Sequence, residues 1–342
     1  MPKTRAGRGR WVRSPRSPAF VPDPARSLVP RRVVVALGGN AILRSKQLNS
    51  YAEQFENVRR TCRQMAQLVA AGHELILTHG NGPQVGNLLI QNEAAADLVP
   101  PVPLDVCGAE TQGQIGYMIQ QSLRNELTTL GLVRSVVALI TEVLVDADDP
   151  AFAAPTKPVG PFFPREVAEQ RTRTRGETWA EIDARGWRKL VCSPQPVGIV
   201  EADAIHVMVD AGVIVVAGGG GGVPVLRRPD GRFEGLEVVV DKDLAAYRLA
   251  LEVRAEALLV LTDVPGVATD FGKPTQRFLR HVTLSELEDH LVREPFSAGS
   301  MGPKVRAAYR FVRDGGRQST ICALEDALAG LRGDAGTVIR AG

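Results

Sequence analysis

The sequence predicts an α/β fold in which a mainly parallel sheet lies between two layers of helices. Short apolar runs of strand length, such as residues 33–37 and 213–217, alternate along the chain with longer amphipathic stretches, such as residues 51–71. Strands that alternate with helices favour parallel pairing, with the connecting helices packed on both faces of the sheet. Runs of glycine follow several of the apolar segments, as expected at the carboxyl ends of strands in such folds.

The individual elements follow from the spacing of apolar residues along the chain. Buried strands are short and continuously apolar, whereas helices repeat apolar residues every three or four positions. The expected strands are 32–37, 74–78, one within 133–145, 213–217, 257–261 and 319–323, with a hairpin at 229–240 around Asp230-Gly231. The expected helices are 51–71, 85–97, 109–130, 244–253, 283–293 and 302–313.

The alternation of strands and helices stops between residues 146 and 190. This segment has many charged residues and prolines at positions 150, 155, 158, 161 and 164. Because proline disrupts helices and central strands, we expect the segment to leave the sheet as a protruding lid subdomain. The predicted organisation is a disordered basic tail at 1–30, an N-terminal lobe at 31–240 that carries the lid at about 146–190, and a C-terminal lobe at 241–342.

The positive net charge of the chain belongs to its first thirty residues. The chain has 41 Lys and Arg against 38 Asp and Glu, and its pI is about 8.7. Residues 1–30 hold seven basic residues and one acid, which leaves 34 basic and 37 acidic residues in the rest of the chain. Nucleic-acid binding needs a basic surface on the folded body, so we expect no nucleic-acid partner.

Apolar runs and cysteines indicate a cytoplasmic protein without a membrane partner. The longest apolar runs have strand length, far short of a membrane span. The four cysteines are scattered and form no CxxC pair, so we expect reduced thiols and no zinc site. The tail at 1–30 has six prolines and no apolar signal-peptide core. We expect it to be a dispensable extension or a misassigned start, with targeting as the alternative.

Four glycine-rich segments are the first indication of a binding site. Each follows a predicted strand or begins a helix: Gly38-Gly39-Asn40, Gly80-Asn81-Gly82-Pro83, residues 218–222 and Gly299-Ser300-Met301-Gly302. Glycine lets backbone N–H groups approach and bind oxyanions, helped by helix N-termini. The chain contains neither the GxxxxGK[ST] string of P-loops nor the GxGxxG string of dinucleotide-binding folds. We therefore expect phosphate binding by another architecture and disfavour a nicotinamide oxidoreductase.

Three lysines stand out in a chain whose basic residues are mostly arginine. Lys242 lies between Asp241 and Asp243 at a strand-to-helix junction, Lys304 lies at a helix start, and Lys157 lies in the proline-rich segment. The lysine ammonium group is a compact point charge that suits a phosphoryl oxygen. We therefore take the three lysines as candidate ligands of a phosphoryl group.

These segments together resemble the carbamate kinases of the amino acid kinase family, over about residues 31–342. The matching strings are Ala36-Leu37-Gly38-Gly39-Asn40-Ala41, His79-Gly80-Asn81-Gly82-Pro83-Gln84-Val85-Gly86, Pro103-Leu104-Asp105, Gln112-Gly113-Gln114-Ile115-Gly116-Tyr117, Pro155-Thr156-Lys157-Pro158-Val159-Gly160-Pro161, Gly186-Trp187-Arg188-Lys189, Ser193-Pro194-Gln195-Pro196, residues 218–224, Val240-Asp241-Lys242-Asp243 and Gly299-Ser300-Met301-Gly302-Pro303-Lys304. Sister enzymes that act on amino acids or glutamate derivatives lack the Pro-Thr-Lys-Pro string. The resemblance implies the amino acid kinase fold, a three-layer αβα sandwich with a mainly parallel central sheet and a protruding lid subdomain.

The resemblance implies a catalytic set of Lys157, Lys242, Lys304, Asp241 and Asn40. Lys242 and Lys304 would contact the nucleotide phosphates and the transferring phosphoryl group, and Asp241 would hold these two lysines in place. Lys157 would reach into the site from the lid, and Asn40 would help to cradle the phosphoryl group.

The resemblance also implies the residues that bind the substrates. Those around the phosphoryl group and the carbamate would be Gly38, Gly39, Gly80, Asn81, Gly82, Gly219 and Gly220. Those around the nucleotide, whose adenine would lie in the C-terminal lobe, would be Thr262, Asp263, Gly266, Met301 and Gly302, together with Lys242 and Lys304.

The implied activity is reversible phosphoryl transfer between ATP and carbamate by a homodimer that uses Mg²⁺ with ATP or ADP. In cells it would form ATP from carbamoyl phosphate after arginine breakdown, in the arginine deiminase pathway. Carbamate carries its own anionic nucleophile, so attack on the γ-phosphate needs no general base, and we interpret His79 as structural. Net carbamoyl phosphate synthesis and a non-catalytic phosphate-ligand sensor on the same fold are the alternatives.

Glu110 departs from the family pattern, which has a neutral residue before Thr111-Gln112-Gly113. A carboxylate that faced the pocket would repel an anionic substrate. A carboxylate that faced solvent would have no such effect, and the sequence leaves both alternatives open.

Deleting the basic tail should leave catalysis intact. A chain that begins at Val29 keeps every candidate site residue, so we expect its kcat/KM for ATP formation from ADP and carbamoyl phosphate to equal that of the full chain. Steady-state kinetics of the two purified proteins measure this. A large loss of kcat/KM in the shorter protein would give the tail a part in catalysis.

Overall fold

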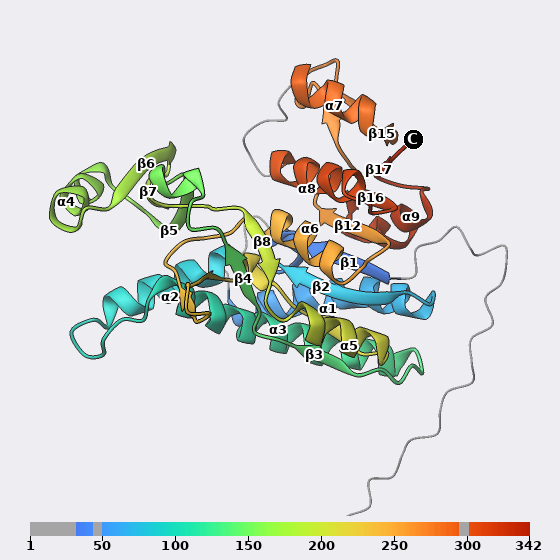
Figure 1. The fold of residues 1–342 in the computed structure, drawn as a ribbon, viewed down its shortest axis with the longest axis horizontal. Coiled ribbons are helices and arrows are strands. Elements are labelled where there is room, and N and C mark those ends of the chain that lie inside the picture. The colour runs from blue at the N-terminus through green and yellow to red at the C-terminus, as the bar shows by residue number, and fades with distance from the viewer. Residues whose placement is uncertain (1–31, 44–49, 294–300) are drawn as a thin grey trace, which may run out of the picture.

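The computed structural model describes residues 32–43, 50–293 and 301–342 of the chain. These residues form a body built on one large sheet, from which a smaller part projects on one side (Figure 1). Residues 1–30, for which the sequence predicts a disordered tail, lie outside the described residues, as do Gly299 and Ser300 of the fourth glycine-rich segment.

Eight strands of the described chain form the central sheet. In spatial order they are β15 (His281–Thr283), β17 (Thr337–Arg340), β16 (Gln318–Ala323), β12 (Ala257–Thr262), β1 (Arg32–Leu37), β2 (Glu74–His79), β9 (Ile214–Val216) and β3 (Val136–Ala138). Neighbouring strands are parallel except for β16 and β17, which pair antiparallel. The sheet is therefore mainly parallel, as the alternation of strands and helices predicts.

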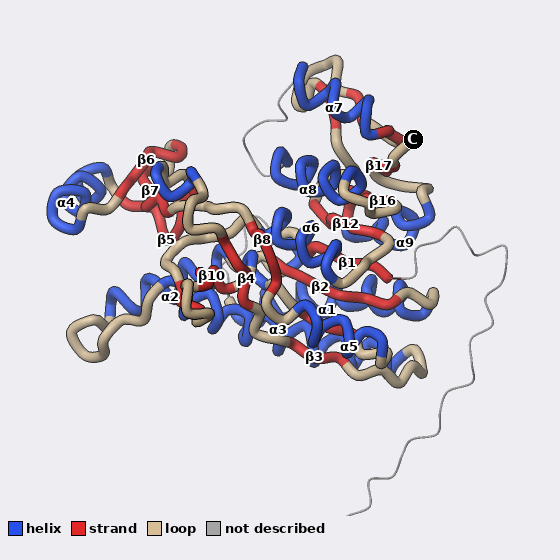
Figure 2. Tube along the Cα trace, in the orientation of Figure 1, coloured by secondary structure: helices blue, strands red, loops and turns tan. Residues whose placement is uncertain are grey.

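Helices cover both faces of this sheet (Figure 2). One face carries α1 (Tyr51–Ala70), α3 (Leu104–Thr129) and α9 (Ala327–Arg332), and the other carries α5 (Ala202–Asp210), α6 (Lys242–Glu252), α7 (Leu284–Arg293) and α8 (Met301–Arg313). Successive strand side chains point to opposite faces, so Val33 and Val35 pack in one core and Val34 and Ala36 in the other. This arrangement confirms the predicted three-layer fold. Among the described helices, none combines the length and the apolar content that crossing a bilayer requires.

The segment between residues 146 and 190 leaves the central sheet, as predicted. Its antiparallel strands β5 (Lys157–Phe163), β7 (Gly186–Val191) and β6 (Thr178–Asp183) form a separate sheet beside α4 (Arg165–Arg175), which projects from the body (Figure 1). Within it, Phe163 meets Trp179 edge-on at 5.4 Å between ring centroids. Strand β5 also contacts α2 (Gly82–Ala94) of the body. The division of the chain into lobes at residue 240 stays a prediction.

The hairpin predicted at residues 229–240 is wrong in its boundaries. Its turn does lie at Asp230-Gly231, with Gly231 at a φ of 86°, but its strands are β10 (Val223–Arg227) and β11 (Phe233–Gly235). Antiparallel arms lie on both sides of their turn, so the first arm must precede Pro229. Strands β10 and β11 continue with β4 (Glu142–Val145) and β8 (Pro196–Ile199) into a four-stranded sheet, and β13 (Ala268–Thr269) pairs separately with β14 (Arg277–Phe278).

Two helices begin earlier than the sequence predicts. Helix α2 begins at Gly82 instead of residue 85, and α3 begins at Leu104 instead of residue 109. Pro83 and Pro103 explain both shifts, because proline suits the start of a helix, where its missing N–H has no partner to lose. Outside the lid, the elements β8, α5, β13, β14, β15, α9 and β17 have no counterpart among the predicted ones.

Truncation of Phe311 should strongly destabilise the protein. Its ring is fully buried in α8 and lies against Gly316. Removal of a buried aromatic ring leaves a cavity, so Phe311→Ala should lower the free energy of unfolding by about 3–5 kcal/mol. The matched control is Phe271→Ala, at a side chain that is 69% exposed, which should change that free energy by less than about 0.5 kcal/mol. Urea unfolding measures both, and equal effects of the two changes would contradict the packing.

Candidate active site

A cavity of about 640 Å³ opens at the carboxyl ends of β1 and β2. Its walls are the loops after these strands, the first turns of α3, the base of the projecting lid, residues 238–243 and the start of α8. Three of the four glycine-rich segments contribute to the lining, through Gly39, Gly80, Gly82, Gly220 and Gly222. Ligands of parallel α/β sheets bind at this edge, so the cavity lies where the sequence predicts a binding site.

Lysine and aspartate side chains from three elements meet in this cavity. Asp243 of α6 accepts hydrogen bonds from Nζ of Lys242, at 2.6 Å, and from Nζ of Lys304 of α8, at 3.2 Å. Asp241 accepts a hydrogen bond from Nζ of Lys157, at the start of β5, at 2.7 Å. All five residues line the cavity. The fold therefore brings together the three lysines that the sequence analysis selected.

The hydrogen bonds of Lys242 and Lys304 go to Asp243, whereas Asp241, which was predicted to hold these lysines, acts on both through its charge. Asp241 is the N-cap of α6, and its Oδ1 accepts the backbone N–H groups of Asp243 and Leu244, at 2.9 and 3.3 Å. An N-cap side chain turns back to its own helix, which leaves only Oδ2 for a lysine from outside. Asp243, inside the first turn of α6 and 3% exposed, contacts both lysines instead. Sequence reasoning missed its role, although Asp243 belongs to one of the matching strings.

Burial and neighbouring charges set the ionisation of this cluster. Burial, together with the charge of Lys242, lowers the pKa of Lys304 below its ordinary value of 10.5, against the opposing effect of Asp243. Burial alone would raise the pKa of Asp241, but the charge and the hydrogen bond of Lys157 outweigh it and bring this pKa below 3.8. Three ammonium groups face two carboxylates. The cluster therefore has one excess positive charge and favours an anion.

The glycine run at 218–222 packs closely against the side chains around the cavity. A Cβ on Gly220 would collide with the Asn81 amide, and a Cβ on Gly222 would collide with Val143. Both glycines also have a positive φ, of 71° and 82°. Only glycine combines this backbone conformation with so close an approach. Gly219, by contrast, lies against His79 and does not line the cavity.

A buried polar network holds this run in place, and of its side chains only Gln112 belongs to a string that carries the family resemblance. Thr78 donates to the carbonyl of Gly218 at 2.9 Å, and the N–H of Gly218 donates to Oγ1 of Thr141 at 3.0 Å. Gln112 of α3 accepts from the N–H of Thr141 at 2.9 Å and donates to its carbonyl at 3.2 Å. Buried polar groups need such partners. The network therefore ties α3 to the glycine run.

Arg188 and Asp105 also line the cavity and were not among the predicted site residues. Nε of Arg188, on β7, donates to the carbonyl of Gly160 at 2.9 Å, and burial lowers the pKa of its guanidinium. Asp105, in the first turn of α3, lies against Gly235 of β11. Both residues belong to strings that carry the family resemblance, and this was the signal that could have found them.

His79 and Glu110 both lie outside the lining of the cavity. His79 is fully buried, its Nδ1 donates to the carbonyl of Gly80 at 2.9 Å, and burial lowers its pKa to about 4. A histidine that stays neutral and bonds to backbone agrees with the structural interpretation. Glu110 is exposed on α3 and does not line the cavity. Its carboxylate is therefore not expected to repel an anionic substrate there.

The remaining predicted residues of the described chain belong to the loop after β1, to β12 and the loop after it, and to the start of α8. Gly38 donates its N–H to the carbonyl of Leu261 at 3.1 Å, and Asn40 lies in the 3-10 turn Gly39–Ala41. The predicted nucleotide residues fall into two groups. Thr262 ends the neighbouring strand β12, and Asp263 and Gly266 follow it, whereas Met301 and Gly302 begin α8.

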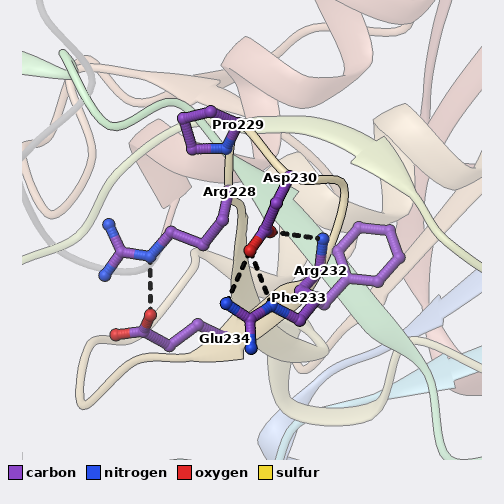
Figure 3. Close-up of a pocket in the computed structure, with 6 residues that line it drawn as sticks. All are labelled: Arg228, Pro229, Asp230, Arg232, Phe233 and Glu234. Atoms are coloured by element: carbon purple, nitrogen blue, oxygen red, sulfur yellow. Dashed lines mark hydrogen bonds and ion pairs between the residues drawn. The ribbon is translucent and has the colours of Figure 1, made fainter.

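A second hollow, of about 480 Å³, lies at the tip of the β10–β11 hairpin (Figure 3). Its charged side chains pair with one another, Arg228 with Glu234 at 2.6 Å and Arg232 with Asp230 at 2.7 Å. These exposed charges are already balanced and gain little from a ligand. The lysine-lined cavity is therefore the better candidate for an active site.

Comparison with known proteins agrees with the fold and the lysine-lined site. The family model "Amino acid kinase family" matches residues 31–323, and the chain therefore belongs to this family. It is 49% identical to the carbamate kinase of Pyrococcus horikoshii over 313 residues, which are 91% of this chain and 99% of that relative. The carbamate kinase of Clostridium perfringens is 45% identical over 312 residues, 90% of this chain and 99% of that relative.

Solved structures that resemble this fold also include carbamate kinases. The carbamate kinase of Giardia lamblia bound to AMP-PNP has a TM-score of 0.86 and 40% identity, and the match covers 91% of this chain and 98% of that one. At this similarity the chain groups, within its family, with the carbamate kinases, and it is a phosphotransferase. The alternative of a non-catalytic sensor has no support among these relatives.

Removal of the Asp243 charge should make Lys304 easier to deprotonate. The burial of Lys304 and the charge of Lys242 both favour the neutral lysine, and in Asp243→Asn they lose the opposing charge and hydrogen bond of Asp243, although the charge of Asp241 remains. We therefore expect the pKa of Lys304, already below 10.5 in the wild type, to fall further in the variant. NMR titration of the lysine side-chain carbons, assigned with Lys304→Arg, measures both values. The exposed carboxylate change Glu288→Gln is the control, and a pKa that rises or stays constant in Asp243→Asn would contradict this cluster.

Proposed function

We propose that the chain catalyses reversible phosphoryl transfer between ATP and carbamate, in which carbamoyl phosphate and ADP give ATP and carbamate. The observation that carries this proposal is the meeting of Lys157, Lys242 and Lys304 in one glycine-lined cavity. Phosphoryl transfer spreads negative charge over three equatorial oxygens, which three ammonium groups from separate elements can surround. The similarity to carbamate kinases supports carbamate as the acceptor.

The acceptor needs no general base in this reaction. Carbamate attacks the γ-phosphorus through an oxygen that is already anionic, so the protein has to position the reactants and neutralise charge. Among the described residues that line the cavity there is no histidine, which agrees with this requirement. Lys242 and Lys304 are held by Asp243 before any substrate binds, so they need little reorganisation in the transition state.

Lys157 connects the lid to the proposed active site. Its ion pair with Asp241 joins the lid to the body, and its side chain is 35% exposed against 7% for Lys304. Carbamoyl phosphate is an acyl phosphate that water hydrolyses, so a lid that covers the site would protect it. We assign Lys157 to the phosphoryl group from the lid side.

The glycine segments supply the remaining contacts of the proposal. Backbone groups of Gly38, Gly39 and Asn40 and of the run at 218–222 would bind the phosphoryl oxygens. Helix α2 begins at Gly82, beside the cavity, and the partial positive charge of a helix N-terminus favours the carboxylate of carbamate. The nucleotide would lie beside the ends of β12 and the start of α8, and the AMP-PNP complex of the Giardia lamblia enzyme supports a nucleotide substrate.

Magnesium would be bound in this site by the phosphates of the nucleotide rather than by a set of protein carboxylates. Among the described residues, no group of three or more His, Cys, Asp or Glu side chains could hold a metal ion, and lysines occupy the carboxylates of Asp241 and Asp243. Mg²⁺ keeps several waters and prefers phosphate oxygens, so it would enter on the phosphates of ATP or ADP. There it would neutralise phosphate charge alongside the lysines.

The cellular part of the proposal is ATP formation from carbamoyl phosphate after arginine breakdown, by a cytoplasmic homodimer. Transfer from an acyl phosphate to ADP is thermodynamically downhill, which supports the ATP-forming direction. All four cysteines lie among the described residues and are free thiols, which supports a reducing compartment. The same residues would also catalyse net carbamoyl phosphate synthesis.

The purified chain should form ATP from ADP and carbamoyl phosphate when magnesium is present. Lys242→Ala removes a positive charge beside the transferring group and should lower kcat by about 10²–10³-fold. The matched control is Lys273→Ala, because Lys273 lies in an exposed ion pair with Asp270, and it should keep the wild-type kcat. A coupled ATP assay measures all three proteins. No ATP from the wild type, or an unchanged kcat in Lys242→Ala, would overturn the proposed function.

A further inference from the structure

The side-chain amide of Asn81 has one orientation, and Thr111 determines it. Thr111 of α3 is fully buried, and its hydroxyl donates its single hydrogen to the carbonyl of Gly108 at 2.7 Å. Oγ1 of Thr111 can then only accept, and its second partner is Nδ2 of Asn81 at 2.9 Å. The amide nitrogen of Asn81 therefore faces Thr111, and the carbonyl oxygen Oδ1 is turned away from it.

Gly220 keeps this amide in place from a second side. Its backbone lies so close to the Asn81 amide that a Cβ there would collide with it. Asn81 lines the cavity together with Gly80 and Gly82. Within the described part of the chain, Oδ1 of Asn81 accepts no hydrogen bond. The structure therefore presents a fixed and free acceptor beside the proposed carbamate pocket.

Free side-chain acceptors are scarce among the described residues that line this cavity. Its lysines and glycine N–H groups are donors, and the carboxylates of Asp241 and Asp243 are held by lysines. Carbamate and carbamoyl phosphate each carry an amino group, where acetate and acetyl phosphate carry a methyl group of similar size. A site that hydrogen-bonds a substrate N–H rejects the analogue that lacks it, because its own polar group then stays unpaired.

We propose that Oδ1 of Asn81 accepts a hydrogen bond from the amino group of carbamate, and that Thr111 is the positioning residue that makes this oxygen available. The pair would then set the preference for an amino-bearing over a methyl-bearing acceptor. This inference rests on the proposed function. Asp105 is the rival acceptor in the lining, but its carboxylate lies against Gly235 and would repel an anionic substrate.

The test compares carbamoyl phosphate with acetyl phosphate, each with ADP, in the full chain and in Thr111→Val. Valine keeps the shape of threonine and removes the hydroxyl, so the Asn81 amide loses its fixed orientation. We expect KM for carbamoyl phosphate to rise by about three- to tenfold while kcat changes by less than about twofold. The apparent affinity for acetyl phosphate, as substrate or as competitive inhibitor, should not change. Thr111→Ser keeps the hydroxyl and should restore the wild-type preference.

Two further variants keep the test decisive if Thr111→Val does not fold. Asn81→Leu removes the acceptor at a partly exposed position and should abolish the preference in the same way. Asp105→Asn tests the rival acceptor and should keep the preference. Thr128→Val is the matched control on α3, because the hydroxyl of Thr128 is exposed and donates to its own helix at 2.9 Å; it should change nothing.

The outcomes separate this inference from the proposed function. A wild type that makes no ATP from carbamoyl phosphate refutes the proposed function. An active wild type without a preference for carbamoyl phosphate, or a full preference in both Thr111→Val and Asn81→Leu, refutes only the inference. A loss of kcat with the preference intact would show a merely structural role and also overturn it. Loss of the preference in Asp105→Asn alone would move the acceptor to Asp105.

Discussion

The arrangement of the site depends on one buried carboxylate, that of Asp243, between the ammonium groups of Lys242 and Lys304. A buried charge that loses its partner destabilises a protein by about 3–5 kcal/mol, so removal of Asp243 would leave the buried Lys304 with one compensating charge fewer. The cluster joins α6 to α8, which pack on each other and on the central sheet. The groups that we propose to bind phosphate therefore also hold two helices together.

The three lysines differ in how firmly the fold holds them. Lys242 and Lys304 belong to the body, whereas Lys157 belongs to the lid and reaches the body through its ion pair with Asp241. A phosphoryl group between them would compete with the carboxylates for the same ammonium groups, which ties substrate binding to the position of the lid. In the proposed reaction, different parts of the chain would therefore supply the rigid charges for the transition state and the cover against water.

The glycine run at 218–222 and the Asn81 amide are held in place by hydrogen bonds between uncharged groups. Thr78, Thr141 and Gln112 fix the glycine run, and Thr111 fixes Asn81. Helix α3 supplies two of these four side chains, so its packing against the sheet determines both the backbone cradle and the amide. A site that must discriminate between similar small anions needs such fixed groups, because a small ligand offers few contacts of its own.

The sequence by itself determined the layers, the mainly parallel sheet, the lid segment and the choice of lysines, because these follow from local apolar spacing, proline content and residue type. It also indicated three glycine segments that the fold brings to one cavity. Only the tertiary structure decided that Asp243 accepts the hydrogen bonds of two lysines, that Pro83 and Pro103 lie at helix starts, and that the first arm of the hairpin precedes Pro229. The polar network and the orientation of Asn81 were likewise invisible in the sequence. These features depend on which side chains of distant elements face one another, and no spacing along a single segment contains that information.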